Sequence, residues 1–192
     1  TIEVAWAEEA KTSGRPLYAW CYLGHLARAF SFYGNFNGFP GCFAHAIDKE
    51  FKLYKQLGYR GMFHCGLPME VDSYVMFRLM DNADLNVDTL LDEYFTGLYG
   101  AAGAPLKELY LAMEKVFCDP AVRQDKVPNG GNAQEVDWKY LGTAERMAGY
   151  GKLVAKTQTL AATDREKRNV KLFELGTWKY MIEGRAQYTL RK

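Results

Sequence analysis

The sequence predicts an α/β first third followed by a region that is all helical. Two short apolar runs, residues 17–23 and 59–65, are bounded by Gly and Pro and have the composition of buried strands. Between them, residues 44–57 carry apolar side chains at helical spacing, and Gly58 stands where a helix C-terminus favours glycine. Strand, helix, strand is the unit that builds parallel sheets. From residue 70 onward, helical periodicity replaces strand signals.

The helical part divides into several amphipathic segments, and Thr163 and Glu166 have the spacing of a capping box. The expected helices cover residues 71–80, 87–99, 105–118, 133–162 and 163–188. Because two strands alone do not make a stable sheet, and because the chain begins with Thr1, we expect further strands outside it. Residues 1–82 are then the last strand–helix–strand part of an α/β domain, and residues 83–192 are a C-terminal helical region.

Composition excludes several classes of function. The net charge is +1 and no basic stripe is present, so a nucleic-acid partner is not expected. No apolar run is long enough to span a membrane. The four cysteines form no C-x-x-C pair, and the three histidines lack the spacing of metal ligands. We therefore predict neither a metal nor a cofactor.

An aromatic-rich segment is the strongest functional signal. Nine aromatic residues lie between Tyr18 and Phe43, in a stretch broken by Gly, Pro and Asn. Such a loop either packs its rings into a small cluster of its own or presents them to a ligand, and flat rings suit the C–H faces of a sugar. Arg28 is either a solvated loop residue or a partner for a uronate carboxylate. The candidate substrate-binding residues are Trp20, Tyr22, Arg28, Tyr33 and Phe36.

Several segments resemble the DUF4838 family of large bacterial proteins related to α-glucuronidases. They are LGYRGMF (57–63), YVMFRLM (74–80), DTLLDEYF (88–95), LYGAA (98–102) and the WCY run at 20–22. The resemblance covers about residues 17–117. It implies that the chain is the C-terminal part of a (β/α)₈ barrel followed by a helical region, in a secreted or periplasmic protein. It also implies a carbohydrate-active enzyme that hydrolyses glycosidic bonds.

Two residues are candidates for catalysis in such an enzyme. Glu70 can serve as a general acid or base, or it can be a first-turn carboxylate favoured by the helix dipole. His64 lies at a predicted strand end and can hydrogen-bond sugar hydroxyls or transfer protons, or it can be a core histidine bonded to the backbone. Where relatives have a carboxylate near this strand end, the chain has His64 and Cys65. The alternative is therefore a barrel that binds carbohydrate or protein without turnover, and the helical region can also serve oligomerisation.

Overall fold

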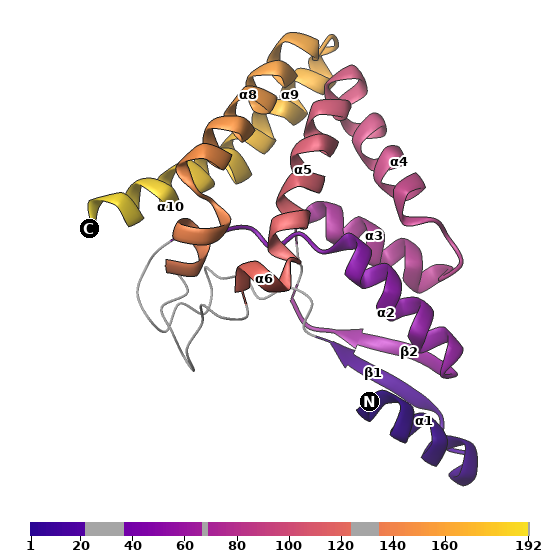
Figure 1. Ribbon diagram of the computed structural model, residues 1–192. Helices are drawn as coiled ribbons and strands as arrows, with labels where there is room; N and C mark the ends of the chain where they lie inside the picture. Colours follow the sequence, from indigo (N-terminus) through magenta and orange to yellow (C-terminus); the bar gives the residue numbers. More distant parts are fainter. Residues whose placement is uncertain (22–36, 67–68, 124–134, 192) are drawn as a thin grey trace. The chain divides into compact units, whose positions relative to one another are not determined.

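The computed structural model describes residues 1–21, 37–66, 69–123 and 135–191. In these residues the chain is mostly helical and has one sheet, which contains two parallel strands (Figure 1). The prediction of a (β/α)₈-barrel fragment was therefore wrong. The strand–helix–strand unit itself is present, but the other elements within the described ranges are all helical. The architecture is that of a helical protein with a small sheet.

Two compact units make up the chain. The first unit takes its described residues from Thr1–Leu26 and Phe43–Leu90, and the second takes them from Ala27–Cys42 and Leu91–Lys192. Each unit is described by itself below.

The first unit contains the sheet. Helix α1 (Ile2–Ser13) ends at Gly14, whose φ of 70° suits glycine. Strand β1 (Leu17–Cys21), helix α2 (Ala44–Gln56) and strand β2 (Tyr59–His64) follow. The tight connection from α2 to β2 passes through Gly58 with a φ of 81°, as the sequence predicts. Helix α3 (Glu70–Asp81) and the first turn of α4 (Val87–Tyr99) complete the unit.

The register of the two strands determines which side chains share a face. Leu17 pairs with Tyr59 and Tyr18 with Gly61, so Arg60 is an extra residue in β2, as in a β-bulge. After this point the pairs run without interruption to Cys21 and His64. Side chains of a strand alternate between faces. Leu17, Ala19, Cys21, Tyr59, Met62 and His64 thus share one face, and Tyr18, Trp20, Gly61 and Phe63 share the other.

Helices α2 and α3 cover the first of these faces (Figure 1). Tyr54 of α2 packs on Tyr59 with ring centroids 4.8 Å apart, and its hydroxyl lies 3.8 Å from the Cys21 sulfur. The same hydroxyl donates a hydrogen bond to Glu50, at 2.5 Å. The helices bury an apolar core between them, formed by Ile47, Phe51, Val71, Val75, Met76 and Leu79.

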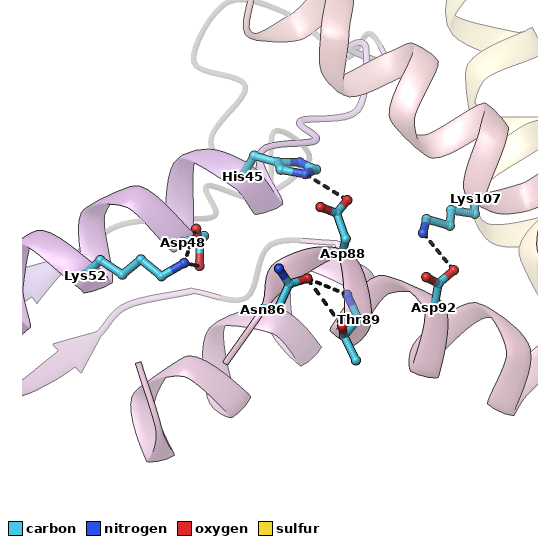
Figure 2. A network of polar contacts seen from close by, with 8 residues as sticks. All are labelled: His45, Asp48, Lys52, Asn86, Asp88, Thr89, Asp92 and Lys107. Carbon is cyan, nitrogen blue, oxygen red and sulfur yellow. Dashed lines mark hydrogen bonds and ion pairs between the residues drawn. The ribbon is translucent and has the colours of Figure 1, made fainter. Parts of the chain in front are cut away.

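Polar contacts lie at the starts of α2 and α4 and between α4 and helix α5 (Gly103–Phe117) (Figure 2). Within the first unit, His45 lies 3.5 Å from the Asp88 carboxylate, and Asn86 caps α4 by accepting a hydrogen bond from the Thr89 backbone at 3.0 Å. Within the second unit, the Lys107 ammonium contacts Asp92 at 2.7 Å. These contacts lie at the surface, where an ion pair contributes at most about 1 kcal/mol.

The secondary-structure elements in the described residues of the second unit are all helical. After α4 and a single 3₁₀ turn it contains helix α5 (Gly103–Phe117), the short helix α6 (Pro120–Arg123), a π-helical turn η2 (Val136–Leu141) and helix α8 (Ala144–Leu160). Helix α9 (Asp164–Phe173), a second π-helical turn η3 (Glu174–Trp178) and helix α10 (Lys179–Leu190) then form one continuous rod. The predicted capping box of Thr163 and Glu166 is present at the start of α9.

One predicted helix is divided in two. The sequence suggested a single helix over residues 133–162, but a break at Gly142 and Thr143 separates η2 from α8. Thr143 is the N-cap of α8 and accepts a hydrogen bond from the Arg146 backbone. The break permits Trp138 to be fully buried, because its ring lies against Gly142 and Gly184, positions where a side chain would overlap it.

Residues 37–42 belong to the core of the second unit although they precede α2 in the chain. The Trp138 indole donates a hydrogen bond to the Asn37 carbonyl oxygen at 2.7 Å. The Gly38 and Phe39 backbone N–H groups donate to Tyr180 and Asp137, at 2.9 and 3.1 Å. A connecting segment is thus held by side chains from two helical elements far away in sequence.

Candidate functional site

Among the described residues of the first unit, the exposed face of the sheet is the most distinctive surface. It carries Tyr18 and Trp20 from β1 and Gly61 and Phe63 from β2, and we call it the aromatic face. Its three aromatic residues remain 65%, 66% and 58% exposed, respectively. Strands place them firmly, because their backbone is fixed by the ladder of hydrogen bonds between β1 and β2.

The rings of the aromatic face are arranged in two cross-strand pairs. Trp20 and Phe63 are directly opposite each other, with ring centroids 5.0 Å apart and planes inclined by 65°. This edge-to-face geometry is a favourable one for aromatic pairs. Tyr18 is opposite Gly61 and lies over it, since a Cβ at Gly61 would be 3.3 Å from the Tyr18 ring. The missing side chain of Gly61 makes room for the Tyr18 ring.

Exposure of this face is unusual for its type of sheet. Parallel sheets are normally covered on both faces, and large apolar patches on a protein surface mark binding sites more often than chance. The aromatic face combines three exposed rings on two adjacent strands. It is therefore the best candidate for a ligand-binding surface in the described residues.

The carboxyl ends of the strands bring together Cys21, His64 and Cys65. Cys65 donates its backbone N–H to the Cys21 carbonyl oxygen at 2.9 Å, which extends the ladder beyond the last strand residue. Burial lowers the pKa of His64, and a hydrogen bond with the Gly66 backbone partly opposes this. Burial also raises the pKa of the Cys21 thiol, so the unreactive protonated thiol is favoured.

The burial of His64 thus favours its neutral imidazole. Its position places it on the covered face of β2, away from the side that carries Trp20 and Phe63. The prediction that His64 acts on a bound sugar has no support from this placement. A neutral, half-buried histidine at a strand end matches the alternative, a structural histidine bonded to the backbone.

The two carboxylates after β2 have different surroundings. Glu70 is exposed in the first turn of α3, where a negative charge is favoured by the helix dipole. Asp72 is fully buried and accepts a hydrogen bond from the Phe43 backbone N–H at 3.0 Å, which joins α3 to the start of α2. Nothing in these positions brings the pair together across a bound substrate, as glycoside hydrolysis would require.

Of the predicted substrate-binding residues, Trp20 lies on the aromatic face. Tyr22, Arg28, Tyr33 and Phe36 lie outside the described residues, so their role stays a prediction. Sequence reasoning did not include Phe63 or Tyr18 among the candidate ligand-binding residues. Regular alternation along β2 predicts that Phe63 and Tyr59 share a face. Because Arg60 is an extra residue between them, Phe63 lies instead on the exposed face, opposite to that of Tyr59.

Three further observations concern the described residues. They contain no group of three or more His, Cys, Asp or Glu side chains that could hold a metal ion. None of the helices in the described ranges is long and apolar enough to cross a membrane. Several apolar side chains on the α9–α10 rod are exposed, namely Leu172, Leu175, Ile182 and Leu190, and self-association through them stays a prediction.

Comparison with known proteins assigns the chain to no family. No family model matches it, and neither the curated proteins nor the solved structures contain a significant match. The resemblance to DUF4838 proteins is therefore still an expectation from the sequence.

Proposed function

We propose that the first unit binds a saccharide on its aromatic face and does not hydrolyse it. The observation that carries this proposal is the outward position of Tyr18, Trp20 and Phe63 on two paired strands. Aromatic rings offer large apolar contact area at little conformational cost, and rings already fixed by strands and by each other lose little freedom on binding.

The chemistry of the face suits a sugar better than other flat ligands. Trp20 exposes most of its indole, on which the C–H groups of one sugar ring can stack, while Phe63 holds the indole edge-to-face. The Tyr18 hydroxyl adds a polar group that can donate to or accept from sugar hydroxyls. A nucleobase would offer an equally flat surface, but a net charge of +1 without a basic stripe provides little to hold a phosphate backbone.

The proposal of binding without turnover follows from the carboxylates. Asp72 is buried and occupied with the Phe43 backbone, and Glu70 lies on α3, the helix packed on the other face of the sheet. Hydrolysis by this unit would need a pair of carboxyl groups on either side of the bond to be cleaved. The arrangement of these two residues supports a binding surface instead.

Binding can be tested by isothermal titration with neutral and acidic plant and mucosal oligosaccharides. We expect Trp20→Ala and Phe63→Ala to weaken binding by about ten-fold or more, the effect of losing one well-buried ring from the complex. The matched controls are Trp6→Ala on α1 and Phe77→Ala on α3, which remove rings of similar exposure, 56% and 54%, outside the aromatic face. Equal losses in control and test variants, or no binding of any saccharide by the unaltered chain, would contradict the proposal.

A further inference from the structure

A pocket lies beside β2 in the first unit and shares one residue, Gly61, with the aromatic face. It has a volume of about 280 Å³ and is lined by residues of α2, β2 and the end of α3. Phe51 and Leu79 are buried apolar residues of its wall, and the rings of Tyr54 and Tyr59 contribute another part. The size fits one large side chain rather than an extended ligand, and Lys55, Asp81 and Asn82 add polar groups to the wall.

The pocket adjoins a strand edge that has backbone groups available for pairing. Consecutive residues of a strand direct their N–H and C=O groups to opposite edges. The Cys65 N–H bonds to β1, so Phe63 and Gly61 face β1 as well, and the intervening Met62 directs its N–H and C=O away from β1. Within the described residues β2 pairs only with β1. Met62 also lines the pocket, so the pocket and the available backbone groups are at the same place.

These two features together define what kind of partner fits. A strand edge with unpaired backbone groups is a template for an added strand, and a pocket beside the edge selects one of the side chains of that strand. The charged residues of the pocket wall, Lys55 and Asp81, have opposite signs and give no preference for a charged side chain. The buried Phe51 and Leu79 and the two tyrosine rings favour an apolar or aromatic one.

We propose that an extended peptide segment of another protein pairs with the open edge of β2 and inserts an apolar side chain into this pocket. The peptide supplies the third strand that a two-stranded sheet lacks, and such a sheet is close to the limit of stability by itself. This site is on the edge and the covered side of β2, whereas the proposed saccharide site is on the outer face. The two proposals can therefore fail separately.

The test uses a panel of acetylated octapeptides in which threonine and valine alternate. The central valine is replaced by glycine, leucine, phenylalanine or lysine, and binding to the full chain is measured by fluorescence polarisation. We expect leucine or phenylalanine at the centre to bind about ten- to a hundred-fold more tightly than glycine, because that side chain leaves water. N-methylation of the backbone amides that face β2 is expected to abolish binding.

Variants of the protein separate the two parts of the site. Met62→Pro removes the outward N–H, a change that an edge strand tolerates, and is expected to weaken all peptides by about three- to ten-fold. Met62→Leu keeps the N–H and is the matched control, with affinities close to those of the original chain. Ala83→Phe fills the pocket from its wall and is expected to remove the preference for leucine or phenylalanine while the glycine peptide binds as before.

Three results would overturn the proposal. The first is that no peptide of the panel binds at millimolar concentration. The second is that binding is unaffected by N-methylation and equal in the Met62→Pro and Met62→Leu variants. The third is a concentration-dependent dimer, seen by sedimentation and lost in Met62→Pro, which would show that the edge pairs with a second copy of the chain. Circular dichroism of each variant confirms that the helical fold is retained.

Discussion

His64 shows how position at a strand end sets the behaviour of one side chain. Its imidazole is partly buried, and burial lowers its pKa from the ordinary value of 6.5. In the unfolded chain the pKa returns to about that value, so below pH 6.5 the unfolded state binds more protons than the folded one. The stabilisation provided by neutral His64 is thus fully present above pH 6.5 and is lost as the pH falls through the folded-state pKa.

The expected consequence is a pH-dependent free energy of unfolding. Urea titrations at a series of pH values from 7.5 to 5 should show the free energy of unfolding falling toward the acidic end. The fall should be smaller in the His64→Gln variant. The control is His45→Gln, at the exposed contact with Asp88. This variant should keep the contribution of His64 to the pH dependence of the free energy of unfolding. Identical pH dependence in the original chain and in His64→Gln would show that burial of this histidine has no such effect.

Among the elements, the helices of the second unit depend on glycine at points of close approach. Gly184 in α10 is buried, and a Cβ there would overlap both the Trp138 ring and the Asn37 carbonyl oxygen. We expect Gly184→Ala to destabilise the second unit by about 1–3 kcal/mol, the usual range for overpacking a core. Faster hydrogen exchange of the Trp138 indole N–H, measured by NMR, would accompany the loss.

Gly149 in α8 provides the matched control for this change. It is also a helical glycine of the second unit, but it is exposed and a Cβ there would meet no atom within 4 Å. Gly149→Ala should therefore stabilise the protein by about 0.5–1 kcal/mol through helix propensity. If both substitutions changed the midpoint of urea unfolding in the same direction, close packing around Gly184 would not be the cause.

Sequence patterns predicted most of the elements, because helical spacing, capping boxes and strand-like apolar runs each depend on residues that are close together in the sequence. Helical spacing identified α2 and α4, the Thr163–Glu166 capping box identified the start of α9, and the apolar runs identified both strands and their parallel pairing. The helix predicted over 133–162 was wrong because Gly142 breaks it to admit a tertiary neighbour, Trp138, and such neighbours are not visible in a local pattern. The same limit applied to the aromatic face, since the pairing of Trp20 with Phe63 depends on strand register.

For the whole molecule, the barrel prediction was wrong because the described residues are mostly helical and form a sheet of two parallel strands. Two strand signals were correctly found, and the requirement for more strands came from general sheet stability and from the resemblance. Nor could the sequence show that residues 37–42 join the second unit. The hydrogen bonds that hold Asn37 involve residues 101 to 150 positions later in the chain.

This long-range insertion predicts that the second unit is incomplete as an isolated polypeptide. Residues 91–192 alone lack the carbonyl acceptor of the Trp138 indole and the backbone donors that satisfy Tyr180 and Asp137. We expect this fragment to melt at a lower temperature than the full chain and to exchange the Trp138 indole hydrogen rapidly.

A synthetic peptide covering residues 37–42 should restore part of the protection of Trp138 when added to the fragment. A peptide with Gly38 replaced by proline lacks the N–H that bonds to the Tyr180 hydroxyl, and serves as the control. Full protection of the indole in the fragment without any peptide would mean that the segment does not contribute to the core of the unit.

The supernumerary Arg60 has a consequence for how β2 tolerates changes of length. If Arg60 were deleted, Leu17–Tyr59 and Tyr18–Gly61 would become successive residue pairs of the two strands. Every later side chain would then keep its side of the sheet. Loss of Met62 instead would invert the strand terminus, turning Phe63 toward the helices and His64 toward solvent. A deletion in this strand therefore preserves side-chain orientation at Arg60, and Phe63 shares the direction of Tyr18 and Trp20 because the residues of β2 after Arg60 are all in place.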